Sequence, residues 1–375
     1  MCAIGDRESY GSAARDPPSA ELQHISSESQ EGERKRKANC NTFSQEIIKR
    51  LAMTEHSTEP SELLNIVRRP LSPDVRLEVP ASLAEYERVQ EVLENEGTKY
   101  PQLWFDGNRN IAIVVAAPSA VHGTMAGGIL QSILEEVKMN QGISSEVRRG
   151  LGLVVDTTNT RGLTTRGWDG ALVYEQGNRS TLMIDVEVGV SQAYESLRAA
   201  ISWSVCALRC PLGIAMSFRE GGRGIIPDML YYPSIQEADN GFRDAEEDFR
   251  CQLTQSPYGP LIREGVTWYG RVRQVILETY RMPDEISAPQ TLLQSSQSFM
   301  IVEDGKFVGD NVPPNLQEVV LGDCIPSHIL SGEEIEATPV NFFRRQWFDN
   351  KFQDSMVKTA VNRMRRRAQF VRSPP

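Results

Sequence analysis

Hydrophobic and polar positions follow two different periods along the central part of the chain, and together these periods predict helices and strands in one fold. Apolar residues at helical spacing, each run preceded by a serine in the N-cap position, predict amphipathic helices over ~83–97, ~120–138 and ~192–208. Short apolar or alternating runs bounded by glycine, proline or polar residues predict strands at 111–117, 151–155, 169–175, 181–188 and 212–216. The pattern therefore favours an α/β core between residues 110 and 218.

The flanking regions are less regular. Residues 1–60 show no apolar periodicity before Phe43 and are expected to be disordered. Within the domain, the pattern predicts a polar loop at 156–167 and two further helices, at ~243–253 and ~265–281. The expected organisation is a domain over 61–282, an acidic extension of short strands and loops over 283–341, and a tail over 342–375 with a basic helix at ~342–370.

The most informative feature is a predicted β-hairpin over residues 169–188, with its loop at 176–180. Pairing across this loop places Asp169 opposite Glu187 and Ala171 opposite Asp185. Opposed residues share a face of the sheet, as do residues two apart, so the three carboxylates are expected to converge on one face. The other face is apolar and fixes the register, because it consists of Leu172, Tyr174, Leu182, Ile184, Val186 and Val188.

Carboxylates held this close repel one another, and binding a hard cation or sharing a proton lowers that cost. Mg²⁺ suits one or two carboxylates together with water and phosphate oxygens, and such an ion assists phosphodiester hydrolysis. The hairpin therefore predicts a site for Mg²⁺ or Mn²⁺ formed by Asp169, Glu187 and Asp185. A half-exposed hairpin whose polar residues simply face solvent explains the same pattern equally well.

Four short motifs surround this hairpin. They are Pro118-Ser119-Ala-Val-His122, Trp168-Asp169-Gly170, Asp185-Val-Glu187-Val-Gly189-Val-Ser191-Gln192, and Leu197-Arg198 in the following helix. Their order and spacing resemble the PD-(D/E)XK nuclease superfamily, and most of all the restriction-endonuclease-like proteins common in fungi. The resemblance covers residues ~80–218 and extends loosely to Leu321-Gly-Asp-Cys-Ile-Pro326, which resembles a final family strand.

The resemblance implies a restriction-endonuclease-like fold, in which a mixed β-sheet core of αβββαβ order is flanked by helices. It also implies a metal-dependent nuclease that hydrolyses phosphodiester bonds in DNA, with Asp169 and Glu187 as the metal-binding acids. By the same resemblance, His122 would orient the substrate or the metal, and Gln192 would take the place of the motif lysine. The implied catalytic set is therefore Asp169, Glu187, Gln192 and His122.

The sequence also departs from the family pattern. Gly189 stands where the motif has lysine, Gly123 stands where the family often has an acid, and Trp168 replaces a proline. No lysine occurs between Lys138 and Lys306. Arginine can supply positive charge but cannot act as a base, and the candidates are Arg161, Arg166 and Arg198. A catalytically inactive nuclease-like fold that binds nucleic acid or a protein partner therefore stays open beside the enzyme.

Charge is distributed unevenly over a chain whose formal net charge is −10. Residues 344–372 contain nine Arg or Lys and two Asp, so this segment carries +7 and the remainder is strongly acidic. An acidic body argues against broad capture of nucleic acid. Local phosphate contacts are expected from the tail, at Arg363, Arg365, Arg366 and Arg367. Docking of the tail on the acidic segment 283–341 would explain its charge as well.

Composition adds constraints on location. Apolar residues make up 40% of the chain and charged residues 24%, which is ordinary globular usage. No apolar run reaches the ~18 residues typical of a membrane span, and residues 1–12 lack a signal-peptide core, so an intracellular protein is expected. The cluster Arg34-Lys35-Arg36-Lys37 is either a nuclear import signal or a solvated run of charge.

Overall fold

The computed structural model describes residues 61–97, 100–190, 194–222, 226–227, 229–282, 292–309, 319–330 and 333–370. These residues belong to one unit, Pro60–Pro375. Residues 1–60, which were expected to be disordered and which include the cluster Arg34–Lys37, lie outside the described residues. Gln192 lies outside them as well.

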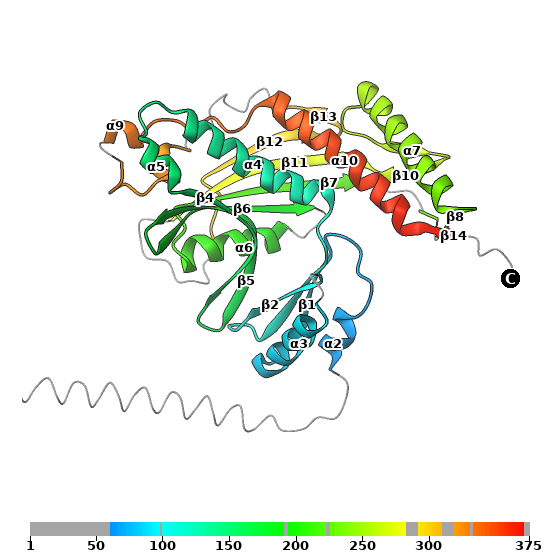
Figure 1. Ribbon diagram of the computed structural model, residues 1–375, viewed down its shortest axis with the longest axis horizontal. Helices are drawn as coiled ribbons and strands as arrows, with labels where there is room; N and C mark the ends of the chain where they lie inside the picture. Colours follow the sequence, from blue (N-terminus) through cyan, green and yellow to red (C-terminus); the bar gives the residue numbers. More distant parts are fainter. Residues whose placement is uncertain are drawn as a thin grey trace, which may run out of the picture. The chain divides into compact units, whose positions relative to one another are not determined.

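The described strands build a mixed sheet at the centre of the fold (Figure 1). They are β1 (Arg76–Pro80), β2 (Gln102–Asp106), β3 (Ile111–Val115), β4 (Leu151–Arg161), β5 (Thr164–Gln176), β6 (Arg179–Val190), β7 (Leu212–Gly221), β11 (Arg271–Arg281), β12 (Gln297–Glu303) and β13 (Lys306–Phe307). Their order is β1-β3-β2-β5-β6-β7-β11-β12-β13, and β4 pairs with β5 beside this path. Strands β6 and β7 run parallel, as expected when a helix connects them.

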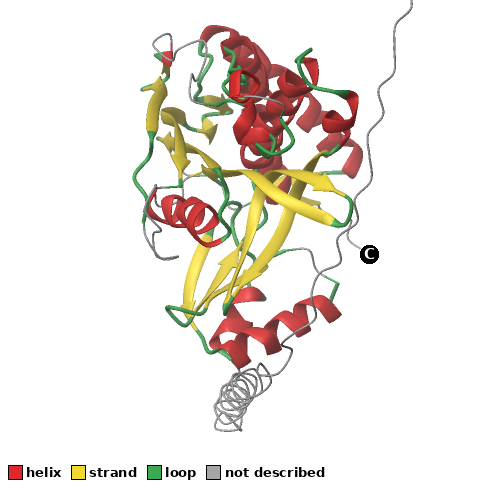
Figure 2. Ribbon diagram, turned by 90° about the vertical axis from the view of Figure 1, so that its left-hand side faces the viewer, coloured by secondary structure: helices red, strands yellow, loops and turns green. Residues whose placement is uncertain are grey.

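Helices pack on both faces of the sheet (Figure 2). One face is covered by α4 (Ala120–Met139), α7 (Ile235–Gln255) and α10 (Arg345–Arg367), which share the largest hydrophobic core. The other face is covered by α6 (Tyr194–Ala207), which forms a smaller core with β7 and β11 (Figure 1). A separate core joins α2 (Glu62–Val67) and α3 (Leu83–Asn95) to β1, β2 and β3. The architecture is therefore mixed α/β, as the sequence predicts.

The predicted helices at ~83–97, ~120–138 and ~192–208 are confirmed as α3, α4 and α6. The Ser82 hydroxyl accepts the Glu85 amide at 3.2 Å, and the Ser119 hydroxyl accepts the His122 amide at 3.4 Å, so both predicted N-caps are present. The polar helix expected at ~243–253 is the longer α7, and the basic helix expected at ~342–370 is α10.

Short elements complete the described chain. The helices are α5 (Ser145–Arg149), α8 (Leu321–Cys324) and α9 (Glu333–Glu336). Two small sheets pair β9 (Leu261–Arg263) with β10 (Val266–Tyr269) and β8 (Leu230–Tyr232) with β14 (Ala368–Phe370).

Two predictions outside the hairpin are wrong because β-branched residues decide the local structure. The polar loop expected at 156–167 is the end of a long β4–β5 hairpin that turns at Gly162, where φ is +63°. Its threonines suit a strand, and the side chains of Thr160 and Thr165 hydrogen-bond across it at 2.9 Å. The helix expected at ~265–281 is instead β10 and β11, where Tyr269, Val272 and Val275 pack as strand residues.

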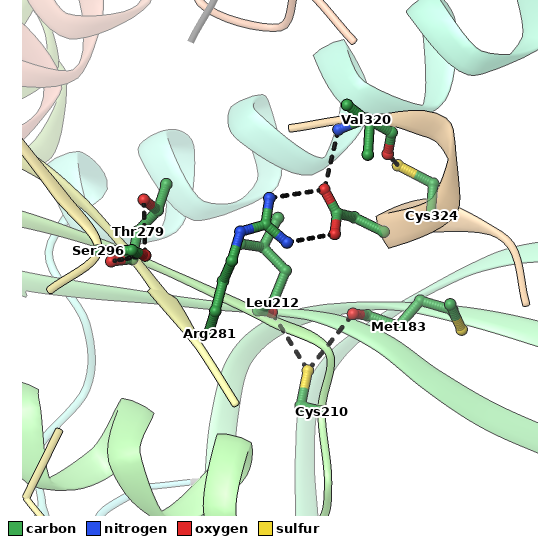
Figure 3. Close-up of polar contacts among 9 residues, drawn as sticks. Met183, Cys210, Leu212, Thr279, Arg281, Ser296, Val320 and Cys324 are labelled. Carbon is green, nitrogen blue, oxygen red and sulfur yellow. Dashed lines mark hydrogen bonds and ion pairs between the residues drawn. The ribbon is translucent and has the colours of Figure 1, made fainter. Parts of the chain in front are cut away.

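The segment Leu321–Pro326, expected to be a strand, contains the short helix α8. An ion pair holds this helix at the end of β11, because Arg281 donates to both Asp323 oxygens, at 2.5 and 2.9 Å. Asp323 in turn accepts the Val320 amide at 2.8 Å (Figure 3). A strand would not bring the Asp323 carboxylate back to the Val320 amide, so this contact favours the helical turn.

Candidate functional site

The site lies where β5 changes its neighbour in the sheet. The carboxyl-terminal half of β5 pairs with β6 from Gly170, opposite Val186, whereas Thr165 pairs with Phe105 of β2. Between these positions β2 and β6 diverge, and a cavity with a volume of about 50 Å³ opens beside Asp169. That volume accommodates a cation with a few water molecules. Its lining comes from β1, β2, β3, α4, β5 and β6 and includes Asp74, Arg76, Trp104, His122, Trp168, Asp169 and Glu187.

The predicted hairpin register is confirmed at the site end, where Ala171 faces Asp185 and Leu172 faces Ile184. Towards the turn the register shifts by one residue, because Met183 forms a bulge. The expected five-residue loop at 176–180 is consequently a two-residue turn between Gln176 and Arg179. The bulge also places Met183, rather than the expected Leu182, in the core.

Asp169 is held through both of its carboxylate oxygens. Oδ1 lies 2.7 Å from Nε2 of His122, and Oδ2 accepts the backbone amide of Val188 at 2.7 Å. The amide of Val188 follows Glu187 directly, so the bond fixes the two acids beside each other at the point where β5 leaves β6. Each oxygen still has a second lone pair for another ligand.

His122 lies between two carboxylates, in the first turn of α4. Its Nδ1 lies 3.5 Å from Oδ1 of Asp74, and Asp74 itself accepts the Ser119 amide at 2.6 Å. Burial alone would lower the pKa of His122, but Asp169 and then Asp74 raise it well above its ordinary value. Both carboxylates thus favour the protonated imidazole, which donates from Nε2 to Asp169.

Glu187 and Asp185 are both buried on the face of the sheet that α6 covers. Burial, together with Asp169 and Asp185, raises the pKa of Glu187 well above its ordinary value. Burial and Asp169 raise the pKa of Asp185 to about 8. Neither oxygen of Asp185 makes a hydrogen bond within the described residues, although the Ser204 hydroxyl lies near enough to favour the charged form. Three carboxyl groups thus lie close together, and the nearby positive charges of Arg76 and His122 only partly offset the rise in the pKa of Glu187.

The predicted site residues are only partly brought together. Asp169, Glu187 and His122 line the same cavity, whereas Asp185 does not, because α6 seals it at 0% exposure. The expected metal role of Asp185 therefore does not follow from its position. Gln192 lies outside the described residues.

The sequence analysis missed the wall that faces the acids. Asp74, Arg76 and Trp104 come from residues 61–110, where no motif marks them. The Arg76 guanidinium lies 5.2 Å from the centre of the Trp104 ring. The alternation of polar and apolar residues along β1 and β2 does not predict that Arg76 and Trp104 line the site, because these strands reach the hairpin only through long-range pairing.

The arginines expected to replace the missing lysine differ in position. Arg166 is buried beside the site, with Nη2 3.4 Å from Asp106 Oδ2 and its guanidinium 6.0 Å from the Trp203 ring centre. Arg198 donates to the Leu293 carbonyl at 2.8 Å, and Arg161 is exposed at the end of β4. Arg166 is therefore the member of this set that acts on Glu187.

The residues present fit a divalent cation held by two acids. No group of three or more His, Cys, Asp or Glu among the described residues is arranged to hold a metal ion. Mg²⁺ nevertheless requires only one or two protein carboxylates, with water filling the other positions. Asp169 and Glu187 supply that number beside a cavity of suitable size.

The basic tail is part of the hydrophobic core. Helix α10 buries Phe348, Phe352 and Met356 against α4 and α7. Arg363 donates to both Glu220 oxygens at 2.8 Å and is 13% exposed, so it stabilises the fold and is not accessible as a phosphate contact. The other expected contacts are exposed at the end of the helix, namely Arg365, Arg366 and Arg367.

Comparison with protein-family models, with curated proteins and with solved structures found no match. Among the described residues, no helix combines the length and apolar character needed to cross a membrane.

Proposed function

We propose that this protein is a metal-dependent nuclease of the PD-(D/E)XK type that hydrolyses phosphodiester bonds in DNA. One observation carries the proposal: Asp169, Glu187 and His122, supplied by three separate sequence motifs, line a single cavity. Random scatter of polar residues would not bring a hairpin's two acids and a distant helix terminus to the same point.

The order of elements supports this proposal. Helix α4, strands β4, β5 and β6, helix α6 and strand β7 follow the αβββαβ order that the resemblance implies, with the short α5 between α4 and β4. The acids lie on the second and third of these strands, and the parallel pairing of β6 with β7 requires the α6 crossover. We therefore infer a restriction-endonuclease-like core.

In this proposal Asp169 and Glu187 hold Mg²⁺ or Mn²⁺. The bound ion would supply an activated water and neutralise charge on the phosphate. The chain's own groups prepare the site: the Val188 amide and His122 orient the Asp169 carboxylate. Trp104 and Trp168 form apolar walls that limit access of bulk water. The protonated His122 also holds a proton at Nε2, beside the reacting centre.

The metal site is tested by calorimetric titration with Mn²⁺. We expect Asp169→Asn and Glu187→Gln each to weaken binding at least about tenfold, because each removes one of two charged ligands. Asp248→Asn, an exposed acid on α7, is the matched control and should bind like the wild type. Absence of binding by the wild type, or equal binding by Asp169→Asn, would refute the metal site.

Activity is tested by incubating plasmid DNA with Mg²⁺. We expect nicking by the wild type and none by Glu187→Gln. Cleavage that persists in the Glu187→Gln protein would show that the activity comes from another site or from a contaminant.

An inactive nucleic-acid-binding domain is the second candidate function. The observation that favours it is the absence of lysine from the described lining of the cavity, together with Gly189 at the motif position. This candidate predicts that the wild type binds an oligonucleotide but leaves it intact with either Mg²⁺ or Mn²⁺.

A further inference from the structure

An arginine from outside every sequence motif forms the cavity wall opposite the acids. Arg76 lies on β1, an edge strand of the sheet, and its guanidinium is stacked over Trp104. Within the part of the chain that the structure describes, Arg76 forms no ion pair, and its Nε is buried without a hydrogen-bond partner. Arg76 is half-buried, and its buried Nε is destabilising because this donor loses water without gaining another acceptor.

The charges around Arg76 explain why it has no fixed partner. Burial and the neighbouring Arg166 lower its pKa to about 10, while Glu187, Glu78 and Asp169 raise it. Arg76 therefore stays a cation at neutral pH. Glu78, the acid on the same strand, is already paired with Arg109 through contacts of 3.2 and 2.6 Å.

Arg166 adds a second guanidinium beside the first, and this one is buried. Its Nε and Nη1 also lack hydrogen-bond partners among the described residues, and its contact with Asp106 is long at 3.4 Å. Arg76 lines the cavity and Arg166 lies behind the lining, so together they place two guanidinium groups with unused donors near one point, which is the composition of an anion site. The acids that line the same cavity weaken anion binding, and a metal cation held by them would strengthen it.

We propose that Arg76, supported by Arg166, forms an oxyanion subsite that binds the phosphoryl group of the substrate. This inference rests on the proposed function and assigns phosphate binding to an arginine from a strand that none of the sequence motifs covers. The planar guanidinium donates to two phosphate oxygens, while the Trp104 ring fixes its plane. Arg76 is a substrate-positioning residue here, because arginine cannot serve as the base.

The test measures inorganic phosphate binding by calorimetry, with the protein both Mn²⁺-loaded and metal-free. We expect phosphate to bind the Mn²⁺-loaded wild type. In Arg76→Gln the phosphate Kd should rise at least about tenfold while Mn²⁺ affinity is retained or increased. Arg76→Lys keeps the charge but lacks the planar group that donates two parallel hydrogen bonds, so its phosphate Kd should lie between those of the wild type and Arg76→Gln. Arg88→Gln, which removes an exposed arginine on α3, is the matched control and should behave like the wild type.

The outcomes separate this inference from the proposed function. Unchanged phosphate affinity in Arg76→Gln, or no phosphate binding by the wild type under either condition, would overturn the subsite. Failure of the wild type to bind Mn²⁺ would refute the metal site, and the metal-free comparison would still decide the role of Arg76. Circular dichroism shows whether Arg76→Gln folds, and if it does not, the comparison uses Arg76→Lys. Wild-type affinity in Arg76→Lys would then also count against the inference.

Discussion

Three carboxyl groups, Asp169, Asp185 and Glu187, lie close together at one end of the hairpin, and their depth sets how readily they ionise. Asp169 has a protonated histidine and a backbone amide as partners. Asp185 and Glu187 are 0% and 4% exposed and have raised pKa values. The residue-scale consequence is a cluster that gains stability from protons or a cation, and that is strained when fully ionised.

Replacing Asp185 tests this strain through its dependence on pH. The carboxyl ionises near pH 4 in the unfolded chain but near pH 8 in the folded protein, so rising pH removes stability between these values. The loss from this group is at most about 1.4 kcal/mol per pH unit. Asp185→Asn mimics the protonated form, so its stability relative to the wild type should increase from pH 5 to pH 8. Urea unfolding at both values measures this, and a constant difference, as expected for Asp248→Asn, would contradict it.

The His122 pKa offers a second residue-scale prediction. The Asp169 contact at 2.7 Å is shorter than the Asp74 contact at 3.5 Å, so Asp169→Asn should lower the pKa of His122 more than Asp74→Asn does. The stability from these pairs is present at low pH and is lost as pH rises through the raised pKa. Histidine-detected NMR titration of the three proteins measures the pKa. An equal shift in both variants would show that Asp169 is not the main partner.

At the scale of elements, α4 connects the site to the core. Its N-terminus carries His122, and its middle packs on α10, where a Cβ at Gly128 would lie 2.8 Å from Trp347. Glycine inside a helix normally costs stability. Gly128 is explained by this close approach, whereas Gly127 has open space around the equivalent position.

These two adjacent glycines provide a matched pair of substitutions. Gly127→Ala should stabilise the protein by up to about 1 kcal/mol through helix propensity. Gly128→Ala forces the Trp347 ring to move, at a cost of about 1–3 kcal/mol, and should be neutral or destabilising. Urea midpoints compare the two proteins directly. A Gly128→Ala protein as stable as Gly127→Ala would mean that α4 and α10 are not tightly packed.

At the scale of the whole molecule, the carboxyl-terminal helix belongs to the fold and also presents charge. Its apolar side completes the largest core, and Arg363 pairs with Glu220. Deleting residues 344–375 should therefore abolish cooperative unfolding, because Phe348, Phe352 and Met356 lose their places. Circular dichroism during heating measures this, and a cooperative transition in the truncated protein would contradict it.

Charge at the end of that helix is tested without disturbing the core. Replacing Arg365, Arg366 and Arg367 by glutamine should reduce the salt dependence of DNA binding, by up to about 0.9 in the log–log slope per lost phosphate contact. The control replaces three exposed arginines elsewhere, Arg88, Arg149 and Arg179, and so has the same net charge. An equal change in both triple variants would show that the tail has no specific role.

Local patterns predicted the acidic half of the site because it lies within one hairpin. Alternation in period two placed Asp169 beside Glu187 without knowledge of any other strand. The opposing half could not be predicted in this way, because Arg76 reaches the cavity through a sheet order that local sequence does not encode. The helix prediction for residues 265–281 was wrong for a related reason. The apolar spacing is compatible with a helix, but β11 pairs with β7 and β12 as a strand.

The two sides of the cavity are supported by different hydrophobic cores. Arg76 and Trp104 belong to strands whose hydrophobic support comes from α2 and α3, whereas Asp169 and Glu187 extend from the main body of the sheet. A substitution such as Val89→Ala, beneath the smaller of these supports, would alter the gap between the positive and negative walls without touching either. Affinity can thus drift through mutations that no inspection of the cavity lining would identify.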